Sequence, residues 1–448
     1  MKYGIRILFC PLIFILFSCR KQFSDQTFSS KSNNHFLSSK PNIIVILGDD
    51  VGYEIPTYTG GQSYSTTNID YLAANGMQFS QCHSTPLCSP SRFMLLTGKY
   101  GFRNYSEWGI MDTSQRTFAN LLRDAGYATC VVGKWQFNGG DQSIHKFGFD
   151  RYSIFDPQTS NTGDHDAIDP KRYKNAHVYQ WKNGCIIDSQ STGYGPDISF
   201  NYARDFIDSA NQPFLLYYAS ELVHPPFSPT PDDPEYASWN PDLGISDTSF
   251  FPSMVRYMNK LIGSLRNHLD SLGILNNTII FFVGDNGTSE AITSTFNGQS
   301  VQGGKSEINE RGTHVPLIAY WPGTISPAVN DDLIDFTDLL PTLADIAKIS
   351  LPSYGPLDGV SFYPRLIGAS RTPRSWIFTY YKIHPSATGY RIVQNSDTKE
   401  IQKIKKSGDT TIKYYFIPPY PRLDSSIKKS AVPKQTRRTF DSVLSVER

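Results

Sequence analysis

The sequence has little excess charge of either sign, and it has no repeats. Its 42 Lys and Arg and 41 Asp and Glu residues give a net charge of +1. This balance argues against a nucleic-acid-binding protein, which would need a basic stripe. The lack of a recurring period of about 20 to 50 residues argues against a solenoid or a propeller. Aromatic residues make up 13% of the chain, which excludes a disordered or fibrous protein and suits a secreted protein that handles carbohydrate.

The first 40 residues are typical of an exported protein. Residues 7–17 form an apolar run of signal-peptide length that is too short to span a bilayer. The four residues that end in Cys19 (LFSC) resemble a bacterial lipobox, so we expect a signal peptide over residues 1–18 and lipidation of Cys19. A plain cleaved signal is the alternative. Residues 19–40 predict a flexible tether, and the expected location is the cell envelope (periplasm or outer membrane), with the membrane as a partner through the lipid.

Apolar runs of strand length alternate with segments of helical period through most of the 448 residues. This alternation predicts an α/β fold with a mainly parallel sheet flanked by helices. Strands are expected at residues 42–47, 128–132, 214–219, 278–283 and 315–320. A helix over residues 254–272 presents one apolar stripe. A shorter helix is expected directly after Thr117, whose side chain can cap it.

Polar side chains follow four of these strands, where ligands of open α/β sheets bind. They are Asp49, Asp50, Lys134, His224, Asp285 and Asn286. Three carboxylates and an amide offer oxygen ligands, which suit a hard cation such as Ca²⁺ or Mg²⁺ and disfavour zinc. For each residue alone, a turn or a helix cap is the alternative role.

Cys88 comes just before a segment that favours the start of a helix. Pro90 and Ser91 are typical of a first helical turn. At such a point the helix dipole and the free N–H groups favour an anion such as a thiolate. Arg92 would project from the same turn. The alternative role for Cys88 is a small buried side chain.

The segment CSPSR at residues 88–92, with TG at residues 97–98, is similar to the signature of type I sulfatases. In that family the cysteine is oxidised to formylglycine after synthesis. Segments that resemble other family blocks follow in family order, at residues 41–53, 67–79, 126–135, 314–323, 335–347 and 358–368. The resemblance implies an alkaline-phosphatase-like fold with a catalytic domain over residues 41–350. It also implies hydrolysis of sulfate esters and a formylglycine-generating maturation enzyme as a partner.

The resemblance also implies a metal site. It makes Asp49, Asp50, Asp285, Asn286 and the modified Cys88 the ligands of Ca²⁺. One hydroxyl of the hydrated aldehyde would attack sulfur, and the second would collapse and expel sulfate.

Four basic residues complete the implied catalytic set. Arg92 would stabilise the aldehyde hydrate, and Lys134 and Lys305 would hold sulfate oxygens. His224 would protonate the leaving alcohol if a neighbouring anion raised its pKa.

The sequence departs from the family pattern at several positions. The usual histidine two residues after Lys134 is Gln136, which cannot act as a base and is expected to bind substrate. His83, five residues before Cys88, is an alternative base, with a surface or packing role equally open. A usual arginine is replaced by His314.

The expected substrate is a sulfated glycan. Glutamine at the position of Gln136 resembles a subgroup of bacterial polysaccharide sulfatases, and this resemblance suggests a galactose-type 4-O-sulfate. Two alternatives stay open. One is a catalytically impaired glycan-binding lipoprotein, which Gln136 would permit. The other is a phosphatase or phosphodiesterase of the same superfold, which would need a Ser or Thr nucleophile and two metals.

Beyond residue 350 the alternation stops, and residues 351–448 resemble the small antiparallel C-terminal subdomain of sulfatases. Strands are expected at residues 376–382, 389–394 and 412–417. The lysine-rich residues 399–406 are expected to form a solvated face, with contact to an anionic glycan as the alternative.

Six cysteines give no disulfide framework. Beyond those in the signal, the lipobox and the signature, Cys82, Cys130 and Cys185 are left, and this number is odd. One bridge among them stays open.

Overall fold

The structure is a computed structural model that describes residues 40–445, apart from 104, 108, 156–171, 183, 212, 352–356 and 383–386. The predicted signal peptide, Cys19 and nearly all of the predicted tether lie outside these residues. Among the helices of the described part, none has the length and apolar character needed to cross a membrane.

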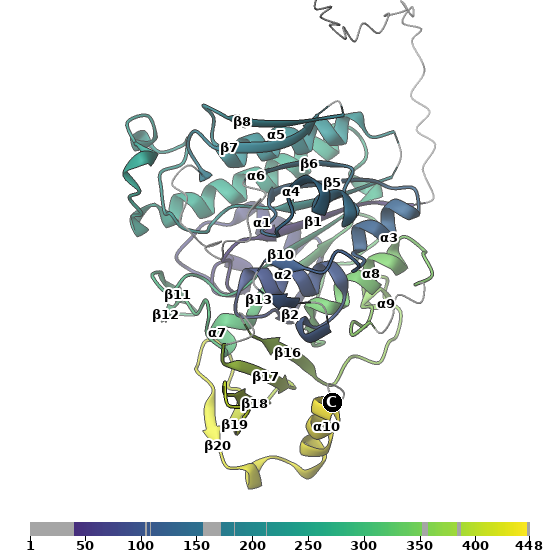
Figure 1. Cartoon of the computed structure of the whole chain (residues 1–448), viewed down its shortest axis with the longest axis vertical. Helices are drawn as coiled ribbons and strands as arrows, with labels where there is room; N and C mark the ends of the chain where they lie inside the picture. The colour runs from purple at the N-terminus through teal and green to yellow at the C-terminus, as the bar shows by residue number, and fades with distance from the viewer. Residues whose placement is uncertain are drawn as a thin grey trace, which may run out of the picture. The chain divides into compact units, whose positions relative to one another are not determined.

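The main element of the fold is a large sheet whose central strands are parallel (Figure 1). The strand order is β14-β2-β13-β10-β1-β9-β5-β6-β7-β8, and β15 also pairs with β2. The strands are β1 (Asn42–Gly48), β2 (Met77–His83), β5 (Ala128–Lys134), β6 (Arg151–Phe155), β7 (His177–Lys182), β8 (Cys185–Gln190), β9 (Phe214–Ala219), β10 (Thr278–Gly284), β13 (His314–Tyr320), β14 (Ala328–Asn330) and β15 (Ile334–Asp335). Strands β10, β1, β9, β5 and β6 are parallel neighbours, whereas β13 is antiparallel to β10. The expected mainly parallel α/β sheet is confirmed.

Helices cover both faces of this sheet because alternate residues of the buried strands belong to two different apolar cores. Ile43 and Val45 of β1 belong to one core together with Phe93, and Ile44 belongs to the other together with Leu261. The helices are α1 (Thr67–Ala74), α2 (Cys88–Thr97), α3 (Phe118–Asp124), α4 (Gly140–Lys146), α5 (Gly195–Ser209), α6 (Phe251–Ser271), α7 (Glu310–Thr313), α8 (Leu339–Ile346), α9 (Tyr363–Leu366) and α10 (Lys434–Ser445). Both predicted helices are present, as α6 and as α3, and Thr117 caps α3 in a capping box with Asn120.

The C-terminal part forms a second, antiparallel sheet, as predicted. Its order is β16 (Ile377–Tyr381), β17 (Gly389–Gln394), β18 (Thr398–Ile404), β19 (Thr410–Phe416) and β20 (Ser425–Ile427). Two short hairpins, β3 (Tyr105–Glu107) with β4 (Ile110–Met111) and β11 (Thr293–Phe296) with β12 (Gln299–Gln302), complete the strands of the described residues.

The prediction that the lysine-rich segment is a solvated face is wrong for Lys399. Its side chain is fully buried and its ammonium lies 3.0 Å from Glu310 of α7 and 2.9 Å from Asp424. Two acidic partners compensate the cost of burying its charge.

The three leftover cysteines do not pair. Cys82 and Cys130 are buried, Cys185 is exposed, and all three carry free thiols.

Candidate active site

The carboxyl ends of β1 and β10 bring four predicted residues together. The parallel register pairs Gly48 with Gly284, so the residues that follow each strand lie side by side. The backbone N–H of Asp50 donates to Asp285 Oδ1 at 3.0 Å, and Asn286 Nδ2 donates to Asp50 Oδ1 at 2.8 Å. Asp50 has a φ of 59°, a left-handed conformation that Asp tolerates better than most residues. Asp49 and these three residues are all fully buried.

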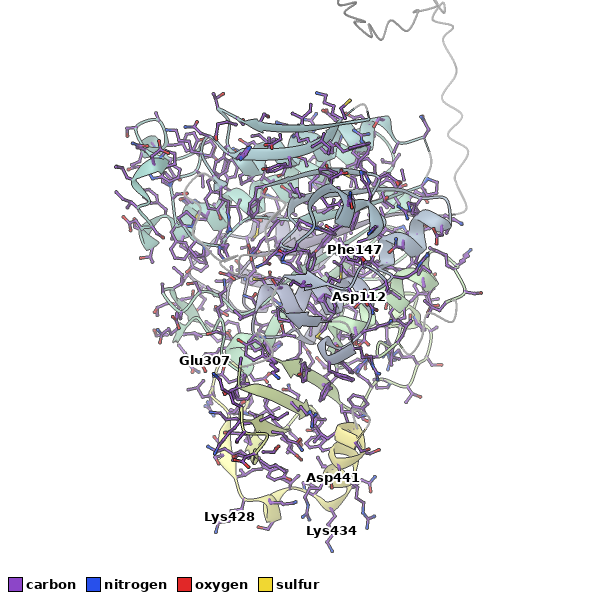
Figure 2. The ribbon with its side chains drawn as sticks, viewed as in Figure 1. Asp112, Phe147, Glu307, Lys428, Lys434 and Asp441 are labelled. Atoms are coloured by element: carbon purple, nitrogen blue, oxygen red, sulfur yellow. The ribbon has the colours of Figure 1, made fainter. Side chains whose placement is uncertain are left out.

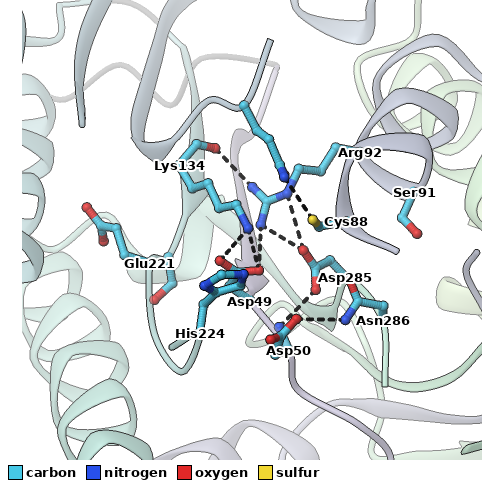
Figure 3. Close-up of polar contacts among 12 residues, drawn as sticks. Asp49, Asp50, Cys88, Ser91, Arg92, Lys134, Glu221, His224, Asp285 and Asn286 are labelled. Carbon is cyan, nitrogen blue, oxygen red and sulfur yellow. Dashed lines mark hydrogen bonds and ion pairs between the residues drawn. The ribbon is translucent and has the colours of Figure 1, made fainter. Parts of the chain in front are cut away.

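Cys88 is the first residue of α2 and is 0% exposed. One ligand atom each from Asp49, Cys88 and Asp285 lie within 4.8 Å of one another. Figure 3 shows the sulfur beside Arg92 and Asp285. Gln136 Nε2 donates to Cys88 Sγ at 2.8 Å. The predicted nucleophile and the predicted metal ligands therefore form one cluster.

Three basic side chains neutralise the carboxylates, and Figure 3 labels Arg92 and Lys134 among them. Arg92 Nη2 lies 2.8 Å from Asp285 and 3.6 Å from Asp49. Lys134, the last residue of β5, lies 2.7 Å from Asp49 Oδ2. Lys305 Nζ lies 3.0 Å from Asp50. Three positive charges in the cluster that contains Cys88 suit a bound anion such as a sulfate group.

The acidic groups respond differently to burial. Burial and the charge of Asp49 raise the pKa of Asp285 to about 7, although Arg92 opposes this shift. Burial also raises the pKa of Asp50. For Asp49, the effect of burial is outweighed by Lys134 and other nearby positive charges, which hold its pKa well below the ordinary value. Two carboxyl groups therefore resist ionisation where no cation lies between them.

This donor set fits a hard divalent cation. The Oδ1 atom of Asn286 is buried and accepts no hydrogen bond from any side chain or backbone group in the described residues. It lies next to three buried carboxylates, and oxygen ligands of this kind are those that Ca²⁺ prefers. A cation would also hold Asp50 and Asp285 in the ionised form.

The loop after β9 carries His224 toward the same cluster. Ligand atoms of Asp49, Asp50 and His224 lie within 4.8 Å of one another. His224 Nε2 is buried and has no hydrogen-bond partner among the described residues. Burial, Lys305 and Lys134 lower the pKa of His224 well below its ordinary value. An anion that neutralised both lysines would oppose this shift.

Three residues of this region were not predicted from the sequence. Arg172 Nη1 lies 2.6 Å from His224 Nδ1, and Tyr173 donates its hydroxyl hydrogen bond to the backbone carbonyl of His224. Glu221 belongs to the same loop and is buried, and burial raises its pKa to about 7. None of these residues belongs to a local motif, so no sequence signal identifies them.

His83 belongs to another cluster. Its ring stacks on His314 at a centroid distance of 4.9 Å and lies 3.9 Å from Glu310. Burial lowers the pKa of His83 to about 3. These contacts favour the packing role over the role of base.

Comparison with known proteins identifies sulfatases as relatives of this chain. The "Sulfatase" family model matches residues 41–349. Bovine arylsulfatase A (Bos taurus) is 31% identical over 386 residues, which cover 78% of this chain and 72% of the relative. N-acetylgalactosamine-6-O-sulfatase of Bacteroides thetaiotaomicron is 30% identical over 452 residues, covering 84% and 85%. The solved structure of Ps i-CgsB in complex with k-i-k-neocarrahexaose matches with a TM-score of 0.67 and 25% identity, covering 81% and 84%. The fold is of the alkaline-phosphatase-like class that the sequence resemblance implied. The chain belongs to the sulfatase family and is a sulfuric ester hydrolase.

Proposed function

We propose that this sulfatase removes O-sulfate groups from glycans, with a formylglycine formed from Cys88 and with Ca²⁺. The observation that carries the proposal is the position of Cys88. Its sulfur lies at the start of α2, among buried carboxylates, and within hydrogen-bond distance of Gln136. A relative named for N-acetylgalactosamine 6-O-sulfate and a structural neighbour bound to a neocarrahexaose support a carbohydrate substrate.

The metal would be held by Asp49, Asp50, Asp285, Asn286 and the modified Cys88. When bound, Ca²⁺ supplies positive charge that offsets the charge on the sulfate oxygens. The formylglycine hydrate supplies a nucleophile with a second hydroxyl through which sulfate can leave.

The remaining side chains act on the sulfate group and on the leaving alcohol. Lys134 and Lys305 bind sulfate oxygens, and Arg92 orients the side chain at position 88. His224 donates a proton to the alcohol oxygen from Nε2, the buried nitrogen that has no partner among the described residues. Gln136 positions substrate with its amide. It cannot accept a proton as a base.

The expected cellular context follows from the N-terminal sequence. We infer export through the signal peptide at residues 1–18 and attachment to the membrane by lipid on Cys19. A maturation enzyme that oxidises Cys88 is the required partner. For the sugar, the proposal is a galactose-type 4-O-sulfate.

The test combines mass spectrometry with a substrate panel. The protein, produced together with a maturation enzyme, is digested, and the peptide that contains residue 88 is weighed. The same preparation is assayed for sulfate release from sulfated mono- and oligosaccharides, including galactose and N-acetylgalactosamine sulfated at position 4 or 6. We expect 3-oxoalanine at position 88 and release from the 4-sulfated galactose series. A reduced thiol in active protein would exclude the formylglycine route, and tight binding without release would favour a binding protein.

A further inference from the structure

The C-terminal part of the chain carries a strong positive charge that the active site does not use. Residues 351–448 contain 17 Lys and Arg against seven Asp and Glu, whereas residues 1–350 contain 25 against 34. The near-neutral total therefore hides two parts of opposite charge. Figure 2 labels Lys428 and Lys434, whose side chains extend outward from this C-terminal part. Both are exposed. A surface of this charge attracts polyanions.

A groove of about 360 Å³ lies on this part of the molecule, between α10 and the residue before β16. It is lined by Trp376, Gln435, Arg438, Thr439, Ser442 and Val443. The volume falls in the range of small-molecule sites, about 300–1,000 Å³. The groove is therefore large enough to hold part of a saccharide chain.

The spacing of the lining residues shows how α10 builds this groove. Residues 435, 438, 439 and 442 recur every three or four positions and share one face of the helix. Phe440 and Leu444 are buried and belong to the larger apolar core, so they hold α10 in place. The exposed face presents an amide, a guanidinium and two hydroxyl groups.

Trp376 gives the groove a rigid aromatic wall. Its indole is partly buried and packs against the same core, and the guanidinium of Arg374 lies 5.8 Å from the ring centroid. An indole held in this way offers a flat apolar surface to a sugar ring, and the lining polar groups can bond to hydroxyls. Arg438 can bind a sulfate group through two parallel hydrogen bonds, as arginine binds phosphate.

We propose that this groove is a second, non-catalytic binding site for a sulfated glycan chain. Trp376 stacks on a sugar ring, and Arg438 binds a sulfate group that the active site does not cleave. The inference rests on the proposed function, because the ligand is of the same class as the proposed substrate. Binding of one chain at two places would raise its effective concentration at the active site.

The test measures binding of chondroitin sulfate oligosaccharides to the whole protein by calorimetry. The background is Cys88→Ala with Lys134→Ala, which prevents turnover and weakens binding at the active site. Trp376→Ala and Arg438→Ala should each weaken the remaining binding by about tenfold, the usual cost of losing an anchor residue. Matched controls are Phe416→Ala and Lys413→Ala, which remove an exposed aromatic ring and an exposed charge from β19. They should leave the affinity within about twofold.

Several results would overturn the inference. The first is unchanged binding in both groove variants. The second is a loss of affinity in Lys413→Ala that equals the loss in the groove variants. The third is that Trp376→Ala weakens the binding of polyglutamate, which has charge but no sugar, as much as it weakens the binding of the oligosaccharide. If Trp376→Ala lowers the melting temperature strongly, Arg438→Glu on the exposed helix face decides the question. Because the assay needs no turnover, its outcome is independent of whether sulfate release is observed.

Discussion

The side-chain amide of Gln136 donates a hydrogen bond to the sulfur of Cys88 at 2.8 Å. This contact puts the residue that replaces the family's usual histidine directly beside the proposed nucleophile. Gln136 reaches this position with a φ of 64°, in the left-handed region. A donor fixed at this point can hold the group at position 88, and it cannot remove a proton from it.

The Cys88→Ala variant should lose sulfatase activity without losing its fold. Ala removes only a sulfur atom from a buried position, whereas the proposed reaction needs the oxidised side chain. Sulfate release and the melting temperature measure the two effects. Cys130→Ala, which removes a thiol buried in the apolar core that contains Ile44, is the control and should keep its activity. Substantial residual turnover in Cys88→Ala would refute the assignment of the nucleophile.

Gln136→Ala should reduce kcat/KM far less than Lys134→Ala. The loss for Lys134→Ala should be about 10²- to 10³-fold, as for other groups that stabilise developing charge. For Gln136→Ala we expect about tenfold, because the amide only positions substrate. Steady-state kinetics on one sulfated monosaccharide compare the two variants. Equal losses would mean that Gln136 takes part in the chemistry.

Ca²⁺ should stabilise the protein more at pH 8 than at pH 5. The pKa of Asp285 is raised to about 7 in the fold without metal, above the ordinary value of 3.8. Without metal, this group therefore lowers stability as pH rises from about 4 to 7, because the folded state holds the proton more tightly. Ca²⁺ binds the ionised form, so its effect should grow over the same interval.

Thermal melts with Ca²⁺ or with a chelator, from pH 5 to pH 8, measure this effect. The Asp285→Asn variant is the control, because it removes the titrating group while keeping one oxygen. Its response to Ca²⁺ should be weaker and should change less with pH, although the raised pKa of Asp50 remains. A calcium effect in the native protein that is the same at every pH would contradict the prediction.

Lys399→Ala should destabilise the protein by about 3–5 kcal/mol, because it leaves Glu310 and Asp424 buried without their cation. Lys413→Ala removes an exposed lysine of the neighbouring strand and should cost less than about 0.5 kcal/mol. Urea unfolding measures both values. A loss for Lys399→Ala no larger than the control would show that the buried pair contributes little.

The cluster of Lys399, Glu310 and Asp424 also predicts that the free energy of unfolding falls at acid pH. Burial alone would raise the pKa of Glu310, but Lys399 and nearby groups outweigh it and lower the pKa from 4.5 to about 2. The stabilisation is therefore complete above about pH 4.5 and is lost as pH falls toward 2. Native protein should lose this part of its unfolding free energy over that interval, whereas Glu310→Gln should not.

Local pattern was enough to predict the strands that carry the site. The apolar runs of β1, β5, β9 and β10 are continuous because both faces of a central parallel sheet are buried. Asp49, Lys134 and Asp285 could be placed together because parallel strands end at one edge of the sheet. Pro90 and Ser91 predicted the start of α2, because the first turn of a helix has its own residue preferences.

Contacts between distant segments could not be predicted in this way. Lys399 looks like part of a solvated run, and only the folded chain reveals its partner Glu310, 89 positions away. Arg172 approaches His224 across 52 positions, and neither residue lies in a pattern that marks the other. Such pairs depend on packing between elements, which sequence periodicity does not record.

The burial of Cys88 limits when the proposed oxidation can occur. The side chain is 0% exposed in the folded protein. A modifying enzyme therefore has to reach this segment during synthesis or export, before the domain closes around it. Folded material from a host that lacks such an enzyme should remain inactive when the enzyme is added later, and only refolding in its presence would recover activity.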